Sequence, residues 1–130
     1  MTGTSGFKLV LAVLLLYAVA VFGPVHAKGS EGANSAATIS IAEMPAQGVQ
    51  VYNLIAQGGP FDYEKDGVVF GNRERLLPVR SRGFYREYTV KTPGSTNRGA
   101  RRIVCGGEPR KPDACYYTAD HYASFRRIVP

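Results

Sequence analysis

The first long run of apolar residues in the chain covers residues 9–22, just after the basic residue Lys8. Val25 and Ala27 then stand where a signal peptidase reads small residues. This pattern predicts a signal peptide over residues 1–27. A retained membrane anchor is the alternative, because the run is near the lower length limit for a spanning helix. Cleavage predicts a secreted, extracellular protein without stable membrane association.

Beyond this run, the apolar positions recur with the periods of a helix and of short strands. Residues 28–36 are small and polar and predict a flexible lead-in. Alternation over residues 38–41 predicts a short strand. After Pro45, which suits a first helical turn, apolar residues at helical spacing predict a helix that ends at Gly58-Gly59-Pro60. Aromatic, β-branched and other apolar residues predict further strands over 84–90, 102–105, 115–118 and 123–125.

One helix followed by several antiparallel strands indicates an α+β fold. The length suits one small domain over residues 37–130 with one modest core. Alternation in the strand over 84–90 places Glu87 and Thr89 on one face and Arg86 and Tyr88 on the other. Glu87 can then face a cleft. Alternatively, it is an exposed cross-strand partner of an arginine.

The charge of the chain favours an anionic partner. The formal net charge is +6, and removal of residues 1–27 takes away Lys8 but no acidic residue, which leaves +5. A small basic secreted protein is suited to nucleic acid or to an acidic surface. His26 lies in the predicted signal peptide, so His121 is the only histidine of the mature chain. We therefore expect neither a histidine-based metal site nor another cofactor.

Two cysteines, Cys105 and Cys115, lie in the mature part. In an exported protein, a disulfide between them is the default expectation. A catalytic thiol and a metal-binding pair are the alternatives.

Four residues combine the groups needed for phosphoryl transfer without a metal: Glu87, Arg98, Arg102 and His121. A carboxylate can accept a proton, and an imidazolium can donate one. Guanidinium groups stay charged and can bind phosphate oxygens in pairs. In the alternative interpretation, Arg98, Arg101 and Arg102 form only a solvated basic face.

Several motifs support this chemistry through their order and spacing along the chain. They are Tyr52-Asn53-Leu54-Ile55-Ala56, Gly59-Pro60-Phe61, Asp66-Gly67-Val68-Val69-Phe70, Asn72-Arg73-Glu74, Leu77-Pro78, Tyr85-Arg86-Glu87-Tyr88-Thr89-Val90, Thr92-Pro93-Gly94, Arg98-Gly99-Ala100-Arg101-Arg102-Ile103 and Asp120-His121-Tyr122. Together they resemble the secreted microbial guanyl-specific ribonucleases, the family that includes barnase, and above all its small bacterial members. The resemblance covers roughly residues 38–128.

The resemblance implies one main helix packed on a twisted antiparallel sheet, with substrate across the open sheet face. It assigns the general base to Glu87, the general acid to His121 and phosphate binding to Arg98 and Arg102. It places guanine binding on a second set of residues: Phe70, Gly71, Asn72, Arg73, Glu74 and Tyr122. The implied reaction is cleavage of single-stranded RNA 3′ to guanosine, through a 2′,3′-cyclic phosphate that is then hydrolysed.

Guanine selection has a chemical basis in this loop. The Glu74 carboxylate can accept hydrogen bonds from N1–H and the N2 amino group, and the amides of residues 71–73 can donate to O6. Phe70 and Tyr122 can stack on the base. The alternatives are core packing for Phe70 and a surface ion pair of Glu74 with Arg73 or Arg75.

Some positions depart from the family pattern. Gly71 stands where relatives often carry a polar side chain and could loosen the loop. The segment from Cys105 to Cys115 looks lengthened, and its cysteine pair differs from the terminus-linking disulfide of some relatives. A secreted RNA-binding module without catalysis is the main alternative function, and a structural domain that kept the fold is the second. For the enzyme, we expect a monomer with a proteinaceous intracellular inhibitor as a further partner.

Overall fold

The computed structural model describes residues 37–130. The predicted signal peptide and the lead-in over residues 28–36 lie outside these described residues. Within residues 37–130, no helix combines the length and apolarity needed to cross a bilayer.

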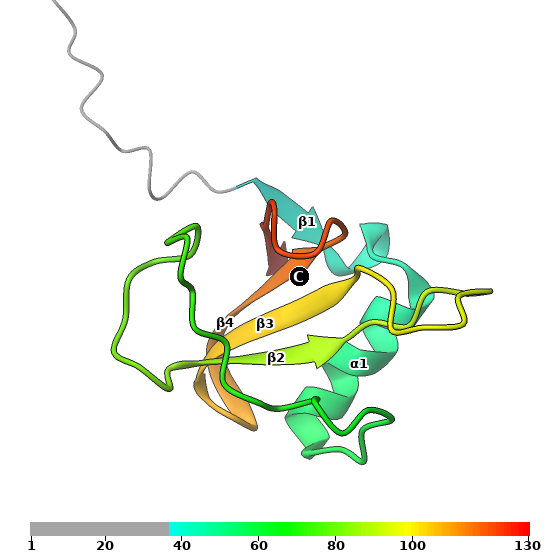
Figure 1. Cartoon of the computed structure of the whole chain (residues 1–130), viewed down its shortest axis with the longest axis horizontal. Helices are drawn as coiled ribbons and strands as arrows, with labels where there is room; N and C mark the ends of the chain where they lie inside the picture. Colours follow the sequence, from blue (N-terminus) through cyan, green and yellow to red (C-terminus); the bar gives the residue numbers. More distant parts are fainter. Residues whose placement is uncertain (1–36) are drawn as a thin grey trace, which may run out of the picture.

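One α-helix and a five-stranded sheet make up the fold (Figure 1). The elements in chain order are β1 (Thr38–Ser40), a 3₁₀ turn (Ile41–Glu43), α1 (Ala46–Gln57), β2 (Tyr85–Thr89), β3 (Arg102–Glu108), β4 (Lys111–Thr118) and β5 (Arg126–Val129). The strand order in the sheet is β1-β5-β4-β3-β2. This confirms the predicted α+β fold with one main helix.

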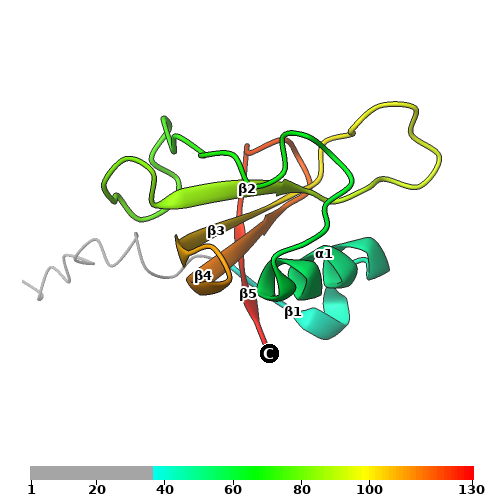
Figure 2. The same ribbon diagram turned by 90° about the horizontal axis from the view of Figure 1, so that it is seen from below.

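Helix α1 covers one face of the sheet (Figure 2). It begins after Pro45 and ends at Gly58, whose left-handed φ of 81° turns the N–H of Gly59 back to the carbonyl of Leu54 at 3.0 Å. Ile55 packs with one face of the strands in the main core, which contains Ile39, Met44, Ile55, Tyr88, Val90, Ile103, Cys105, Cys115, Tyr117 and Ile128. Burial of these side chains fixes which face of each strand is turned toward the helix.

The opposite face of the sheet carries a smaller apolar cluster under the long loop between α1 and β2. Leu77 from this loop packs on Tyr85, Val104 and Tyr116. Residues of the same loop also pair with β2, because the N–H of Phe70 donates to the carbonyl of Tyr85 at 2.9 Å. This cluster supports one end of the sheet face and leaves room for polar side chains farther along the strands.

The predicted disulfide is confirmed. Cys105 of β3 and Cys115 of β4 are direct cross-strand partners, and their sulfur atoms are bonded at 2.06 Å. Both half-cystines are buried in the core beneath α1. Such a bond is typical of proteins that fold in an oxidising compartment.

Two features of the sheet differ from the sequence prediction. The last strand is β5 at Arg126–Val129, so the prediction of a strand over residues 123–125 was wrong. Those residues belong to a hydrogen-bonded loop, and their one large apolar residue, Phe125, packs against Phe70 rather than in a strand pair. In addition, β1 pairs with β5 in parallel, so the sheet is mixed, although the pairs β2–β3, β3–β4 and β4–β5 are antiparallel.

Candidate active site

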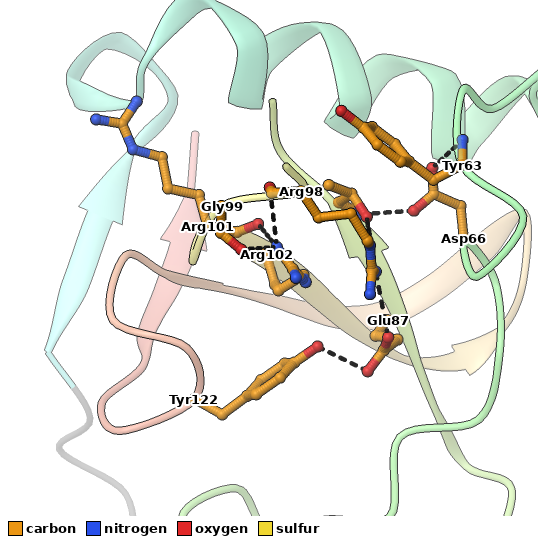
Figure 3. A network of polar contacts seen from close by, with 9 residues as sticks. Tyr63, Asp66, Glu87, Arg98, Gly99, Arg101, Arg102 and Tyr122 are labelled. Atoms are coloured by element: carbon orange, nitrogen blue, oxygen red, sulfur yellow. Dashed lines mark hydrogen bonds and ion pairs between the residues drawn. The ribbon is translucent and has the colours of Figure 1, made fainter. Parts of the chain in front are cut away.

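Strand β2 presents Glu87 and Thr89 on the same face of the sheet, as the alternation predicted. This face lies opposite α1, because Tyr88 and Val90 on the other face pack with Ile55 of the helix. Arg98 contacts both of them. Its Nε and Nη2 donate to Thr89 Oγ1 at 3.1 and 2.8 Å, and Nη2 lies 3.5 Å from Glu87 Oε1 (Figure 3). The Glu87 side chain is 14% exposed and that of Arg98 27%. The arginine comes from the loop after β2, and the strand partner of Glu87 is Val104, so Glu87 is not a simple cross-strand ion pair.

Arg102 stands at the start of β3, directly opposite Thr89. The residue is buried, and its Nη1 donates to the carbonyls of Gly99 and Arg101 at 3.0 and 2.7 Å. Its Nε has no hydrogen-bond partner among residues 37–130. A buried N–H donor without an acceptor is unfavourable, and a phosphate oxygen is an acceptor that suits a guanidinium.

Arg101 does not join this group. Its side chain extends toward the helix layer and away from Glu87 (Figure 3). Of the three neighbouring arginines, Arg98 therefore contacts Glu87, whereas Arg101 does not.

The loop between β4 and β5 carries His121 and Tyr122 in left-handed backbone conformations, with φ of 52° and 71°. The hydroxyl of Tyr122 donates to Glu87 Oε2 at 2.7 Å. Burial, the hydrogen bond to Glu87 and the negative charge of Glu87 raise the pKa of Tyr122 to about 12, against a smaller opposing effect of Arg102. Tyr122 is therefore a neutral hydrogen-bond donor at physiological pH.

A pocket of about 400 Å³ lies beside the polar group formed by Glu87, Arg98 and Tyr122. It is lined by Phe70, Gly71, Asn72, Arg73, Glu74, Leu76, His121, Tyr122, Ala123 and Phe125. All six residues predicted to bind guanine therefore line one pocket together with His121. A pocket of this size can hold a nucleobase.

The loop over residues 70–77 has a defined shape. Asn72 closes it with two hydrogen bonds, from its Nδ2 to the carbonyl of Leu77 at 3.0 Å and from the Leu77 N–H to its Oδ1 at 3.2 Å. Glu74 is exposed and lines the pocket. Among residues 37–130 the only ion pair is Arg98–Glu87, so Glu74 is not paired with Arg73 or Arg75.

Phe70 serves both the apolar cluster and the pocket. Its ring packs on that cluster and stacks on Tyr122, with centroids 4.9 Å apart. Rings in direct contact leave no room for a base between them. A base that stacks on Phe70 from the side of Tyr122 must displace the Tyr122 ring.

Tyr122 joins the two parts of the site. Its ring lines the pocket and its hydroxyl reaches Glu87, whereas Glu87, Arg98 and Arg102 do not line the pocket themselves. Sequence reasoning missed Leu76, Ala123 and Phe125 as lining residues. Phe125 had a signal, because an aromatic residue close after His121 in a short loop is well placed to reach the same pocket.

The described residues contain no group of three or more His, Cys, Asp and Glu side chains that could hold a metal ion. One side of the sheet thus carries a carboxylate, two guanidinium groups and an imidazole, beside a pocket with an unpaired carboxylate. A protein with this set of groups is suited to bind and cleave a phosphodiester next to a nucleobase.

Comparison with known proteins agrees with this class. The family model described as ribonuclease matches residues 27–129. Guanyl-specific ribonuclease Sa of Kitasatospora aureofaciens is 52% identical over 91 residues, which cover 70% of this chain and 92% of that protein. Guanyl-specific ribonuclease Sa3 of the same organism is 56% identical over 90 residues, and the match spans 69% of this chain and 62% of that protein. The chain therefore belongs to the ribonuclease family.

Solved structures give the same result. A structure of ribonuclease Sa2 with mononucleotides aligns with a TM-score of 0.69 at 45% identity, over 74% of this chain and 96% of that chain. A crystal structure of ribonuclease Sa2 with guanosine-2′-cyclophosphate aligns with a TM-score of 0.67 at 44% identity, over 74% and 98%.

Proposed function

We propose that this protein is a guanyl-specific endoribonuclease that cleaves single-stranded RNA 3′ to guanosine, with a 2′,3′-cyclic phosphate as the intermediate. The observation that carries the proposal is the contact of Glu87 with Arg98 and Tyr122 beside a pocket that holds both His121 and Glu74. The names of the similar proteins point to the same specificity.

In the first step, Glu87 removes the proton of the ribose 2′-hydroxyl as its oxygen attacks the phosphorus atom. Arg98 lies beside this carboxylate at 3.5 Å and can hold the carboxylate and a phosphate oxygen at once. His121 protonates the 5′-oxygen as the bond to phosphorus breaks. In the second step, the proton roles reverse and water opens the cyclic phosphate.

Arg98 and Arg102 stabilise the charge that builds up on the phosphoryl oxygens. Their guanidinium groups are fixed by Thr89 and by backbone carbonyls, so little reorganisation is needed at the transition state. The unpaired Nε of Arg102 gains an acceptor if the phosphate approaches as Tyr122 moves aside.

The pocket supplies base selection. Glu74 is unpaired and can accept hydrogen bonds from N1–H and the N2 amino group of guanine, while backbone N–H groups of residues 71–73 donate to O6. Adenine has no proton at N1 and presents a donor at position 6, so it leaves these groups unpaired. Phe70 offers a stacking surface once Tyr122 swings out.

A non-catalytic RNA-binding module of the same fold is the alternative. It would bind RNA without a cyclic phosphate product, whereas a structural domain that kept the fold would tolerate loss of Glu87. We further propose a secreted monomer that an intracellular protein inhibitor can block. The buried disulfide and the basic charge support secretion and an anionic partner.

The test uses a single-stranded RNA oligonucleotide that contains one guanosine, in excess EDTA. We expect one cut 3′ to the guanosine and a cyclic phosphate end by mass spectrometry, and no cleavage of the matching DNA. Glu87→Gln should lose at least about 100-fold in rate, within the range of positioned acid–base groups. Glu108→Gln, at the exposed far end of β3, is the matched control and should be unaffected. Metal-dependent cleavage, or equal cleavage after adenosine, contradicts the proposal.

A further inference from the structure

The loop that carries His121 is held by a carboxylate that has no part in the reaction proposed above. Asp120 accepts three hydrogen bonds: Thr118 Oγ1 donates to Oδ1 at 2.8 Å, the Ser124 N–H donates to Oδ1 at 3.0 Å, and Ser124 Oγ donates to Oδ2 at 2.6 Å. The carboxylate thereby joins Thr118, at the end of β4, to Ser124 and closes the loop around His121.

The same network reaches the backbone of the active-site residues. Thr118 is buried, and its Oγ1 accepts from the N–H of Tyr122 at 3.2 Å. A hydroxyl group can donate one hydrogen bond, and that of Thr118 donates to Asp120. The lone pairs of Thr118 Oγ1 are therefore turned toward the N–H of Tyr122. Loss of the Asp120 carboxylate would let this hydroxyl rotate and would weaken the bond to Tyr122.

The backbone of this loop needs such support. His121 and Tyr122 are consecutive residues with side chains and positive φ, a conformation that L residues adopt only when the surroundings hold them. Among residues 37–130, no side chain hydrogen-bonds the imidazole of His121. Its position therefore depends on its backbone, which the carbonyl of Ala100 anchors at 3.0 Å, and on the loop closed by Asp120.

We propose that Asp120 is a positioning residue that fixes the loop so that His121 can deliver a proton to the leaving oxygen. This inference rests on the proposed ribonuclease function. Asp120 is exposed, and hydrogen bonds from Ser124 and Thr118 lower the pKa of its carboxyl, so it is ionised and able to accept all three bonds at neutral pH.

The role predicts a dependence on the leaving group. A nucleoside leaving group requires a proton from His121, whereas 4-nitrophenolate leaves without one. Asp120→Ala should therefore lower kcat about 10- to 100-fold on guanylyl-3′,5′-cytidine, in line with the cost of about 1 Å of misplacement. It should lower kcat less than about threefold on guanosine 3′-(4-nitrophenyl phosphate). His121→Gln should show the same contrast between the two substrates.

Conservative and control variants complete the experiment. Asp120→Asn keeps an Oδ1 acceptor for Thr118 and Ser124, and should restore kcat to within about fivefold of the wild type. Asp113→Asn and Asp113→Ala remove an equal charge from an exposed site at the other end of β4, and should act as the wild type does. Ser124→Ala removes only the 2.6 Å contact, and should give a smaller loss with the same substrate contrast.

The outcomes separate the two proposals. If the wild type cleaves neither substrate, the proposed function fails. If the wild type cleaves both and Asp120→Ala keeps its kcat, the positioning role is wrong. It is also wrong if Asp120→Ala loses equally on both substrates, because the residue then supports the whole site rather than His121. If circular dichroism shows that Asp120→Ala does not fold, the comparison of the two substrates in Ser124→Ala tests the positioning role instead.

Discussion

Glu74 and Arg98 occupy separate parts of the candidate site, because Glu74 lines the pocket and Arg98 lies against Glu87. Glu74→Ala should lower kcat/KM on guanosine dinucleotides by at least about 100-fold, because two charge-assisted hydrogen bonds are lost. On adenosine dinucleotides, kcat/KM of this variant should change little. On inosine dinucleotides, which lack the amino group, kcat/KM should fall by an intermediate factor. Arg98→Ala should lower kcat/KM on all three bases alike, because phosphate carries no base information. A uniform loss in Glu74→Ala would show that specificity lies elsewhere.

Tyr122 should make stability sensitive to alkaline pH. The folded protein raises the pKa of Tyr122 from 10.0 to about 12. The resulting stabilisation is fully present below pH 10 and is lost as the pH rises through about 12. Two pKa units correspond to about 2.7 kcal/mol, which solvent screening of this partly exposed ring reduces to on the order of 1–2 kcal/mol. Urea denaturation at pH 9 and pH 11.5 checks this.

The comparison protein for that measurement is Tyr122→Phe, which keeps the ring stack on Phe70 but has no hydroxyl. Tyr85 and Tyr88, whose pKa values burial also raises, remain in both proteins and cancel in the difference. The wild type should lose more stability than Tyr122→Phe between the two pH values. An equal loss would mean that Tyr122 does not ionise with a raised pKa.

At the scale of single residues, the sequence was informative where the chemistry and position of a side chain indicate its surroundings. Strand alternation predicted that Glu87 and Thr89 share one face, and Arg98 contacts both of them there. Alternation alone left open whether that face is the one turned away from the helix. The hydrogen bond from Tyr122 to Glu87 could not be predicted, because it depends on two consecutive left-handed residues that no local pattern indicates.

At the scale of elements, helix α1 and strand β2 were the most predictable parts. Their signals are local: helical spacing closed by Gly58, and a run of aromatic and β-branched residues. Strand β5 was misplaced because Phe125 looks like a strand residue, yet the hydrogen bonds of Asp120 with Ser124 favour a loop there. The parallel pairing of β1 with β5 is a contact between the two ends of the domain and has no local signal.

The loop proposed to bind the base, over residues 70–77, offers a test at the same scale. Gly71 does not have a positive φ, and a Cβ there would lie 3.7 Å from the nearest atom of Arg73, in ordinary contact. The glycine is therefore not required, and Gly71→Ala should raise the free energy of unfolding by about 0.4–1 kcal/mol through the entropy of the unfolded chain. Activity on guanosine substrates should persist, since the amide stays in place. Thermal unfolding and kcat/KM of the variant check both points.

A glycine in a different conformation gives the contrast. Gly58 has a φ of 81°, and a Cβ there would lie 3.0 Å from Arg110 Nε, so Gly58→Ala should destabilise the protein. Stabilisation by both variants, or by neither, would contradict the interpretation of the loop as a segment without special backbone demands at residue 71.

At the scale of the whole molecule, the disulfide and the candidate catalytic groups lie on opposite faces of the sheet. Cys105 and Cys115 are buried beneath α1, whereas Glu87 and Arg98 lie on the other face. Reduction should therefore lower the free energy of unfolding by about 2–3 kcal/mol, since the bond closes a short loop. It should leave kcat unchanged while the protein stays folded. Urea denaturation with and without reductant, and kcat at a temperature well below the transition, measure the two effects.

The double variant Cys105→Ala/Cys115→Ala is a second way to obtain the protein without the disulfide. Unlike chemical reduction, it leaves no fraction of molecules with the bond intact. It should reproduce the lower stability, with an added cost for the two cavities, and retain wild-type kcat. A fall in kcat in either folded form would show that the two faces are coupled through β3. Mass spectrometry of exported protein adds the test of compartment, because two free thiols in native material would contradict secretion through an oxidising environment.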